Sequence, residues 1–127
     1  MTQKKTLRLT PAEWRIMRIA WEEESRASRD FCRIAGRLYD WSPSTVKSLL
    51  RRLVEKGYLK TTQVGNSFLY EPTQPAIKAL RKAADFLMEN VVDGASGPLL
   101  SYMVQKSRLS PGEIEELHDL LNNHKGK

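Results

Sequence analysis

The chain has 127 residues, of which 40% are hydrophobic and 28% charged, and its formal net charge is +6. This length corresponds to about one domain and argues against a multi-domain enzyme. No apolar run reaches the roughly 18 residues of a membrane span, and no apolar segment of a secretory signal follows the lysines at the start. We therefore expect a cytoplasmic protein with no membrane segment.

The excess of positive over negative charge is confined to the first part of the sequence. Residues 1–72 contain 14 lysines and arginines against 8 acidic residues, a balance of +6, whereas residues 73–127 contain 7 of each kind. A cationic first part favours a polyanionic partner, and a neutral second part favours a protein partner. On charge alone, a basic surface that serves only solubility is an equal alternative.

Cysteine and histidine usage predicts no metal site and no cofactor. The single cysteine, Cys32, excludes a disulfide within the chain and a multi-cysteine metal site. We interpret it as a small buried hydrophobe in a helix, in preference to a redox or metal role. His118 and His124 are six residues apart, a spacing that does not stack two imidazoles on one helix face, and we expect both to be solvated.

Two short helices are predicted before residue 40. Thr10, Pro11 and Glu13 form a helix start with a capping box, and the tryptophans and isoleucines of residues 14–21 supply a broad core-facing stripe that ends at residues 22–25. Ser28 is predicted to cap a second helix over residues 29–39. Asp40 and Trp41 then form a turn.

The third predicted helix carries two chemically opposed faces. Ser42 caps it, Pro43 lies in its first turn and Gly57 supplies the left-handed residue that ends it. One face repeats apolar side chains at helical spacing: Val46, Leu49, Leu50, Leu53 and Val54. The other face offers hydroxyls and cations without a catalytic acid–base pair: Ser44, Lys47, Ser48, Arg51 and Glu55. With the preceding helix and turn, this pattern predicts a helix-turn-helix that touches phosphates and base edges.

A hairpin and a helical tail follow. Residues 58–63 and 67–71 alternate as strands around the turn residues 64–66, which predicts a wing whose Leu59, Phe68 and Tyr70 pack onto the helices. Helices are predicted over residues 76–92, 98–105 and from the cap Ser110 onward. Their apolar stripes cannot enclose a core, so we expect them to form a homodimer interface through Leu87, Val91, Leu99, Leu100, Met103, Ile114, Leu117, Leu120 and Leu121. The alternative is that the tail folds back on its own head.

The predicted fold is therefore mainly α with a small β-hairpin. A winged helix-turn-helix DNA-binding domain over residues 1–72 precedes a C-terminal helical dimerisation region over residues 73–127.

Several segments resemble the penicillinase repressor family, which contains repressors of β-lactam resistance and copper-responsive repressors. The resemblance runs through Leu9-Thr-Pro-Ala-Glu-Trp14, Trp41-Ser-Pro-Ser-Thr-Val46, residues 50–57, residues 68–70 and residues 109–117, and so covers nearly the whole chain. It implies a dimeric repressor that binds a palindromic operator and leaves it upon an inducing signal.

The resemblance also implies which residues meet DNA. Ser44, Thr45, Lys47 and Ser48 would enter the major groove and Arg52 would contact the backbone, while the role of Arg51 follows from helix geometry. Relatives often carry Arg or Lys after the turn glycine, whereas this chain has Asn66, which predicts a wing contact made by hydrogen bonding. The full predicted DNA-binding set is Ser42, Ser44, Thr45, Lys47, Ser48, Arg51, Arg52, Gln63, Asn66 and Ser67.

Two inducing signals are left open by the sequence. Copper-responsive members end in a Cys-x-Cys set, and this chain has no cysteine after Cys32, although residues 40–41 and 56–59 favour that branch. The β-lactam branch is cut in its dimer region, and the resemblance places Tyr102-Met103 near the corresponding position. Residues 101–108 are therefore a candidate target of a regulatory protease.

Two other classes of function fit the sequence less well than a repressor. A winged-helix module that binds protein instead of DNA would expose an acidic or apolar face on the third helix, whereas this face is cationic. The sequence has no Gly-rich phosphate loop, metal cluster or nucleophile elbow, which argues against an enzyme.

Overall fold

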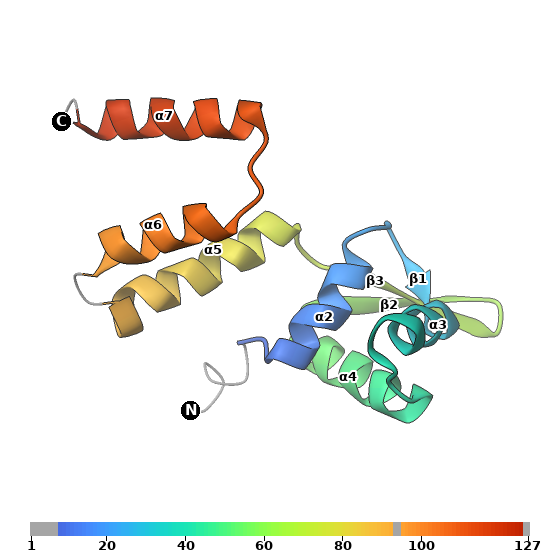
Figure 1. Cartoon of the computed structure of the whole chain (residues 1–127). Coiled ribbons are helices and arrows are strands. Elements are labelled where there is room, and N and C mark those ends of the chain that lie inside the picture. Colours follow the sequence, from blue (N-terminus) through green and yellow to red (C-terminus); the bar gives the residue numbers. More distant parts are fainter. Residues whose placement is uncertain (1–7, 93–94, 126–127) are drawn as a thin grey trace. The chain divides into compact units, whose positions relative to one another are not determined.

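The computed structural model describes residues 8–92 and 95–125. The chain divides into two compact units, residues 1–83 and residues 84–127, each of which is treated by itself. The first unit contains, in chain order, α2 (Pro11–Ala20), β1 (Arg26–Ala27), α3 (Ser28–Tyr39), α4 (Pro43–Glu55), β2 (Leu59–Val64) and β3 (Ser67–Pro72), followed by the start of α5 (Ala76–Leu87). Figure 1 shows α2, α3 and α4 gathered beside the small sheet, with the β2–β3 loop extending beyond α3. The architecture is mainly helical with a small antiparallel sheet, as the sequence predicts.

Helix α2 begins with the predicted capping box. The backbone N–H of Glu13 donates to Thr10 Oγ1 at 3.2 Å, and the backbone N–H of Thr10 donates to Glu13 Oε1 at 2.9 Å. The helix ends at Ala20 with Trp21 as its C-cap, before the glutamates at which the sequence pattern places its end. Trp21 Nε1 donates to the carbonyl of Gln74 at 3.1 Å, which ties the end of α2 to the segment after the sheet.

The start of α3 differs from the prediction. Ala27 is its N-cap and makes no side-chain capping bond, so the capping role predicted for Ser28 is wrong. Residues 26 and 27 instead form strand β1, in which Arg26 pairs with Tyr70 and Ala27 with Leu69. This pairing fixes how the chain enters α3, and it makes the sheet three-stranded with the order β1-β3-β2. At its other end, α3 stops at Asp40, whose left-handed φ of 58° starts the turn.

Helix α4 is capped at both ends, as predicted. Ser42 Oγ accepts the backbone N–H of Thr45 at 3.3 Å, and Pro43 occupies the first turn. At the C-terminus, Gly57 has a φ of 85°, its N–H donates to the carbonyl of Val54 at 3.0 Å, and the N–H of residue 58 donates to the carbonyl of Leu53 at 2.9 Å. These two bonds form a Schellman motif, which requires a left-handed residue and favours glycine there.

Strands β2 and β3 form the predicted hairpin, with Gly65 and Asn66 as its two loop residues. Gly65 has a φ of 62°, which at the first central position matches a type II′ turn and the right-handed twist of the strands. Leu59 is buried and Tyr70 packs edge-on against Phe31, with ring centroids 6.1 Å apart, as predicted.

The core of the first unit lies between the three helices and the base of the hairpin. Its buried apolar residues are Ile16, Met17, Ile19, Ala20, Phe31, Ile34, Ala35, Val46, Leu49, Leu50, Leu53, Tyr58, Leu59 and Ala79. All the apolar positions predicted for α4 are buried except Val54, which is partly buried. This packing turns the polar face of α4 to solvent.

The second unit contains the end of α5 (Ala76–Leu87), the π-helical segment η1 (Met88–Val92), α6 (Ser96–Lys106) and α7 (Pro111–Lys125). The backbone N–H of Glu113 donates to Ser110 Oγ and that of Ser110 to Glu113 Oε1, which confirms the predicted cap before α7. None of the helices in the described ranges is long and apolar enough to cross a membrane.

Candidate nucleic-acid interface

Helix α4 presents a polar, cationic face to solvent. Ser44, Thr45, Lys47, Arg51 and Arg52 are exposed and Ser48 is half-buried. By helical geometry, Ser44, Ser48 and Arg51 lie near the middle of this face, with Lys47 on one edge and Arg52 on the other. Glu55 shares the face near its C-terminal end, so the positive character is concentrated over the first three turns.

The hydroxyl groups at the start of α4 form a small network. Ser42 Oγ lies 3.2 Å from Ser44 Oγ and donates to Thr45 Oγ1 at 3.1 Å, in addition to accepting the Thr45 N–H. Ser42 is therefore occupied in capping the helix, which fixes the orientation of its neighbours. Hydroxyls in this arrangement can both donate to and accept from a base edge or a phosphate.

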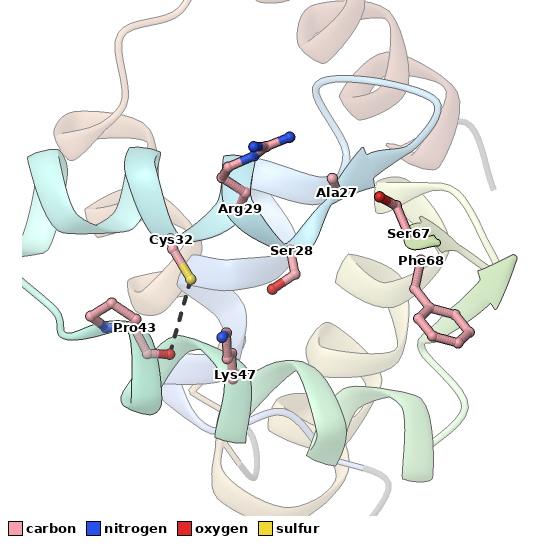
Figure 2. A pocket seen from close by; sticks show the side chains of 8 residues that line it. All are labelled: Ala27, Ser28, Arg29, Cys32, Pro43, Lys47, Ser67 and Phe68. Atoms are coloured by element: carbon pink, nitrogen blue, oxygen red, sulfur yellow. Dashed lines mark hydrogen bonds between the residues drawn. The ribbon is translucent and has the colours of Figure 1, made fainter. Parts of the chain in front are cut away.

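A cleft separates Lys47 from the wing. Figure 2 shows Lys47 on α4 and Ser28 at the start of α3, and across the opening from them Ser67 and Phe68 on β3. The cleft has a volume of about 530 Å³, and Cys32 and Pro43 also line it. Lys47 makes no hydrogen bond or ion pair with the described residues, so its charge is available to an external anion.

Phe68 and Cys32 are both more exposed than the sequence predicts. Phe68 is 51% exposed, so the expectation that it packs onto the helices is wrong: an open cleft lies between it and α3 and α4, and its cross-strand partner is the exposed Gln63. Cys32 is partly and not fully buried, and its Sγ lies 4.0 Å from the carbonyl of Pro43.

The tip of the wing carries the remaining predicted DNA-binding residues. Gln63, Asn66 and Ser67 are all exposed. Gln63 Nε2 donates to the carbonyl of Gly65 at 3.2 Å, which ties this side chain to the turn. The structure places the three residues at the same end of the hairpin, and Ser67 borders the cleft beside Lys47.

Arg52, on the opposite edge of α4, is held by a buried carboxylate. Its Nε lies 3.3 Å from Glu13 Oε2, while Lys56 Nζ lies 2.6 Å from Glu13 Oε1. The Glu13 side chain is 1% exposed and the Arg52 side chain 50% exposed. The sequence identifies Glu13 only as a cap, because an ion pair between α2 and α4 depends on how the two helices dock.

The Glu13 carboxylate also acts on a neighbouring phenol. Burial raises the pKa of Tyr58 above its ordinary value of 10.0, and the negative charge of Glu13 raises it further. Both effects disfavour the tyrosinate, because an anion loses hydration on burial and is repelled by a carboxylate.

The residues predicted for dimerisation form partly exposed apolar surfaces on the second unit. Leu87, Leu99 and Leu117 are half-buried, whereas Leu100, Met103, Ile114, Leu120 and Leu121 are exposed. The side chain of Val91 lies outside the described residues. Between α6 and α7 an apolar groove of about 380 Å³ is lined mainly by Val104, Leu109, Ile114, Leu117 and Leu121. His118 and His124 are exposed, as expected.

Within the described ranges, no group of three His, Cys, Asp or Glu side chains lies close enough together to hold a metal ion. On α4 and the wing, the first unit offers exposed cations, hydroxyls and amides for binding.

Three helices, a two-stranded wing and a solvent-facing basic third helix define a winged-helix domain of the class found in DNA-binding regulators. The chain belongs to the penicillinase repressor family: the profile described as Penicillinase repressor matches residues 9–123. This is a family of transcriptional repressors and not of enzymes.

The similar proteins support the same assignment. An uncharacterised 16.5 kDa protein encoded in the 3′ region of ptsI of Latilactobacillus sakei is 36% identical over 118 residues, 93% of this chain and 81% of that protein. The methicillin resistance regulatory protein MecI of Mammaliicoccus sciuri is 30% identical over 93% of this chain and 96% of its own length. Bacillus licheniformis BlaI, solved as a monomer in complex with the blaP half-operator, is similar over 54% of this chain and 84% of that chain, with a TM-score of 0.50 and 28% identity.

Proposed function

We propose that this protein is a transcriptional repressor that binds a palindromic double-stranded DNA operator as a homodimer in the cytoplasm. Residues 1–72 would form the DNA-binding domain and residues 73–127 the dimerisation region. The observation that carries the proposal is the exposed face of α4, on which neither Lys47 nor Arg51 forms a hydrogen bond or ion pair with the described residues. The complex of the similar BlaI domain with a half-operator supports it.

The two edges and the middle of α4 would have different tasks. A B-DNA major groove, about 12 Å wide, admits one helix, whose central side chains reach base edges while its flanks face the phosphates. We therefore assign base contacts to Ser44, Ser48 and Arg51, and backbone contacts to Arg52. Lys47 lies at the edge nearest the wing, where it can reach either a base or a phosphate.

The wing would add a short-range contact. Gln63, Asn66 and Ser67 are exposed and carry amide and hydroxyl groups, while the described part of the hairpin tip bears no Lys or Arg. Such groups hydrogen-bond a phosphate or a minor-groove acceptor without releasing a counterion. The wing should therefore add affinity with little effect on the salt dependence.

A salt titration tests DNA binding itself. The affinity for a random-sequence duplex should fall steeply with salt. A plot of the logarithm of the association constant against the logarithm of the salt concentration should have a slope of about −0.9 for each phosphate neutralised. Absence of salt-dependent binding to any duplex would refute the proposed function.

The homodimer is supported by the exposed apolar side chains on α6 and α7, which a monomer leaves in water. A two-fold dimer would cover these surfaces and set two copies of α4 one or two helical turns apart on the operator. Sedimentation of the purified protein at micromolar concentration should give the mass of two chains, and a single-chain mass would contradict the dimer.

We further propose that an inducing signal releases the operator, either a copper-type metal signal or proteolysis in a β-lactam-type pathway. The copper-responsive branch favoured by the head sequence stays a prediction, and the similarity to the methicillin resistance regulatory protein MecI supports a β-lactam-type pathway. Addition of copper or zinc ions to the DNA complex, compared with addition of extract from β-lactam-treated cells, separates the two: metal release indicates the first, and cleavage within residues 101–108 the second.

A further inference from the structure

The first unit contains a buried carboxylate that serves two cations of unequal exposure. Glu13 is fully buried, and a buried carboxylate is tolerated only when it is paired and hydrogen-bonded. Its Oε1 accepts the N–H of Thr10 at 2.9 Å and the ammonium of Lys56 at 2.6 Å. Lys56 Nζ also donates to the carbonyl of Arg8 at 2.8 Å, and its side chain is only 13% exposed. Oε1 and Lys56 thus suffice to join α2 to the end of α4.

The second oxygen of Glu13 faces a different residue. Oε2 accepts no hydrogen bond from the described residues, and the cation beside it is Arg52, whose Nε lies 3.3 Å away. Arg52 keeps half of its side chain in solvent at the edge of the α4 face. The same edge forms a shallow groove with Ser44, Thr45 and Ser48.

We propose that Glu13 is a positioning residue for DNA binding, which holds the Arg52 guanidinium at the edge of α4 in the orientation that meets a backbone phosphate. The inference rests on the proposed function and assigns a specific task to a residue that capping alone does not explain. A long arginine side chain normally loses rotamer freedom when it binds, and holding it in place beforehand removes part of that cost. Its planar group then presents its remaining donors to a phosphate.

The test uses Glu13→Gln in the full chain. Glutamine keeps an oxygen acceptor for the Thr10 N–H, so the cap of α2 is preserved while the charge facing Arg52 is removed. We expect the Nε–H signal of Arg52 in the NMR spectrum of the free protein to broaden, and the affinity for the best duplex selected from a random pool to fall about three- to tenfold. Glu22→Gln, which removes an equal charge from the exposed ion-pair partner of Arg26, is the control and should change neither the Arg52 signal nor the affinity.

A double-mutant cycle with Arg52→Gln separates positioning from a structural role. If Glu13 acts through Arg52, Glu13→Gln should cause no further loss of affinity when Arg52 is already replaced. The same loss in both backgrounds, or unchanged affinity and an unchanged Nε–H signal in the single variant, overturns the proposal. If Glu13→Gln does not fold, Glu13→Asp keeps the charge and withdraws it by one methylene. This variant must likewise broaden the Arg52 Nε–H signal and lower the affinity for the selected duplex. Failure of the wild-type protein to bind any duplex would instead reject the proposed function, while the NMR result would still report on the Glu13–Arg52 pair.

Discussion

At the scale of single residues, Lys47 and Arg51 are the side chains on which the proposed recognition most depends. Both are exposed on α4 and make no polar contact with the described residues, so none of those residues competes with DNA for their charge. Arg52 differs because Glu13 already holds it. In the proposed complex the three cations would therefore make two kinds of contact: Lys47 and Arg51 would find their partners only on the DNA, whereas Arg52 would be positioned already in the free protein.

Replacement of Lys47 by Gln should distinguish a base contact from a phosphate contact. If Lys47 reads a base, affinity for the selected duplex falls by about 1–3 kcal/mol while non-specific affinity changes little. If it touches only a phosphate, all sequences weaken alike and the salt slope decreases by about 1. Anisotropy titrations with selected and scrambled duplexes measure both, with the exposed Lys82→Gln on α5 as control. Unchanged binding to both duplexes would exclude Lys47 from the interface.

Tyr58 should give the first unit a stability that declines in alkali. Because its pKa is raised in the folded state, the tyrosine is protonated in both states below pH 10, and its contribution is complete there. Above that pH the unfolded chain loses the proton first, so the free energy of unfolding falls as the pH rises through the folded pKa. Urea unfolding at about pH 8 and pH 11 should show a larger loss for the wild type than for Tyr58→Phe. An equal loss in both proteins would contradict the pKa shift.

Glu13 and Phe68 each have a property that the sequence predicts and another that it does not. The capping role of Glu13 was predictable because Thr10 and Glu13 are three residues apart. Its pairing with Lys56, 43 residues away, depends on the docking of α2 on α4, which no local pattern encodes. The exposure of Phe68 was missed for a related reason: alternation indicates on which face of the hairpin it lies, but not how far the helices extend beneath it.

At the scale of elements, the ends of α4 decide how firmly the recognition surface is held. Ser42 and Gly57 satisfy backbone groups at the two termini, and the buried stripe between them anchors the helix in the core. Because the polar face has few contacts of its own, its position is set by the two capped ends and the buried stripe of α4. A loss at either end should therefore reduce both stability and DNA affinity.

Gly57→Ala should destabilise the first unit by about 1–2 kcal/mol. A Cβ at this position meets no atom within 4 Å, so the cost arises from the positive φ of 85° and not from a clash. Gly36→Ala is a matched control within α3, where the Cβ would meet only the carbonyl of Trp41 at 3.6 Å, an ordinary contact; it should be neutral or stabilising by up to about 1 kcal/mol. Chemical denaturation measures both, and equal effects of the two substitutions would show that the left-handed backbone of Gly57 carries no cost.

Most elements were predictable, since their signals are local. Helices α2, α4 and α7 carry a cap residue, a proline and a periodic apolar stripe within one window of sequence, and the hairpin carries its turn residues between two alternating runs. Strand β1 was not predictable, because its two residues form a strand only by pairing with Leu69 and Tyr70 of β3. With Ala27 paired in this strand, α3 begins at Ser28, one residue before the predicted start, and Ser28 does not cap it.

At the scale of the whole molecule, the two units differ in how much apolar surface they bury. The first encloses a core of fourteen buried apolar residues, whereas α6 has no buried residue among those described. A second unit with large exposed side chains and little core of its own is understandable if a second copy covers it. The sequence predicts this surface from helical periodicity, but which faces meet in a dimer is a property of two chains and stays a proposal.

Leu120→Asp should separate dimerisation from DNA recognition. Leu120 is 65% exposed, so a charge there costs the isolated chain little but would be buried in the proposed interface. Sedimentation should shift from two chains to one, and affinity for a duplex with two half-sites should fall on the order of 100-fold while affinity for a single half-site is kept. Asn122→Asp adds the same charge to α7 and is the control. A dimer that persists in Leu120→Asp would place the interface elsewhere.

The most direct test of the central claim is selection of duplexes from a randomised pool by the purified chain, followed by sequencing of those retained. The proposed repressor predicts enrichment of a palindromic motif whose half-sites lie about 10 base pairs, or a multiple of this, apart, and loss of that motif with Lys47→Gln and Arg51→Gln combined. Retention of duplexes without any common sequence, or the same motif with the two substitutions in place, would contradict recognition by α4.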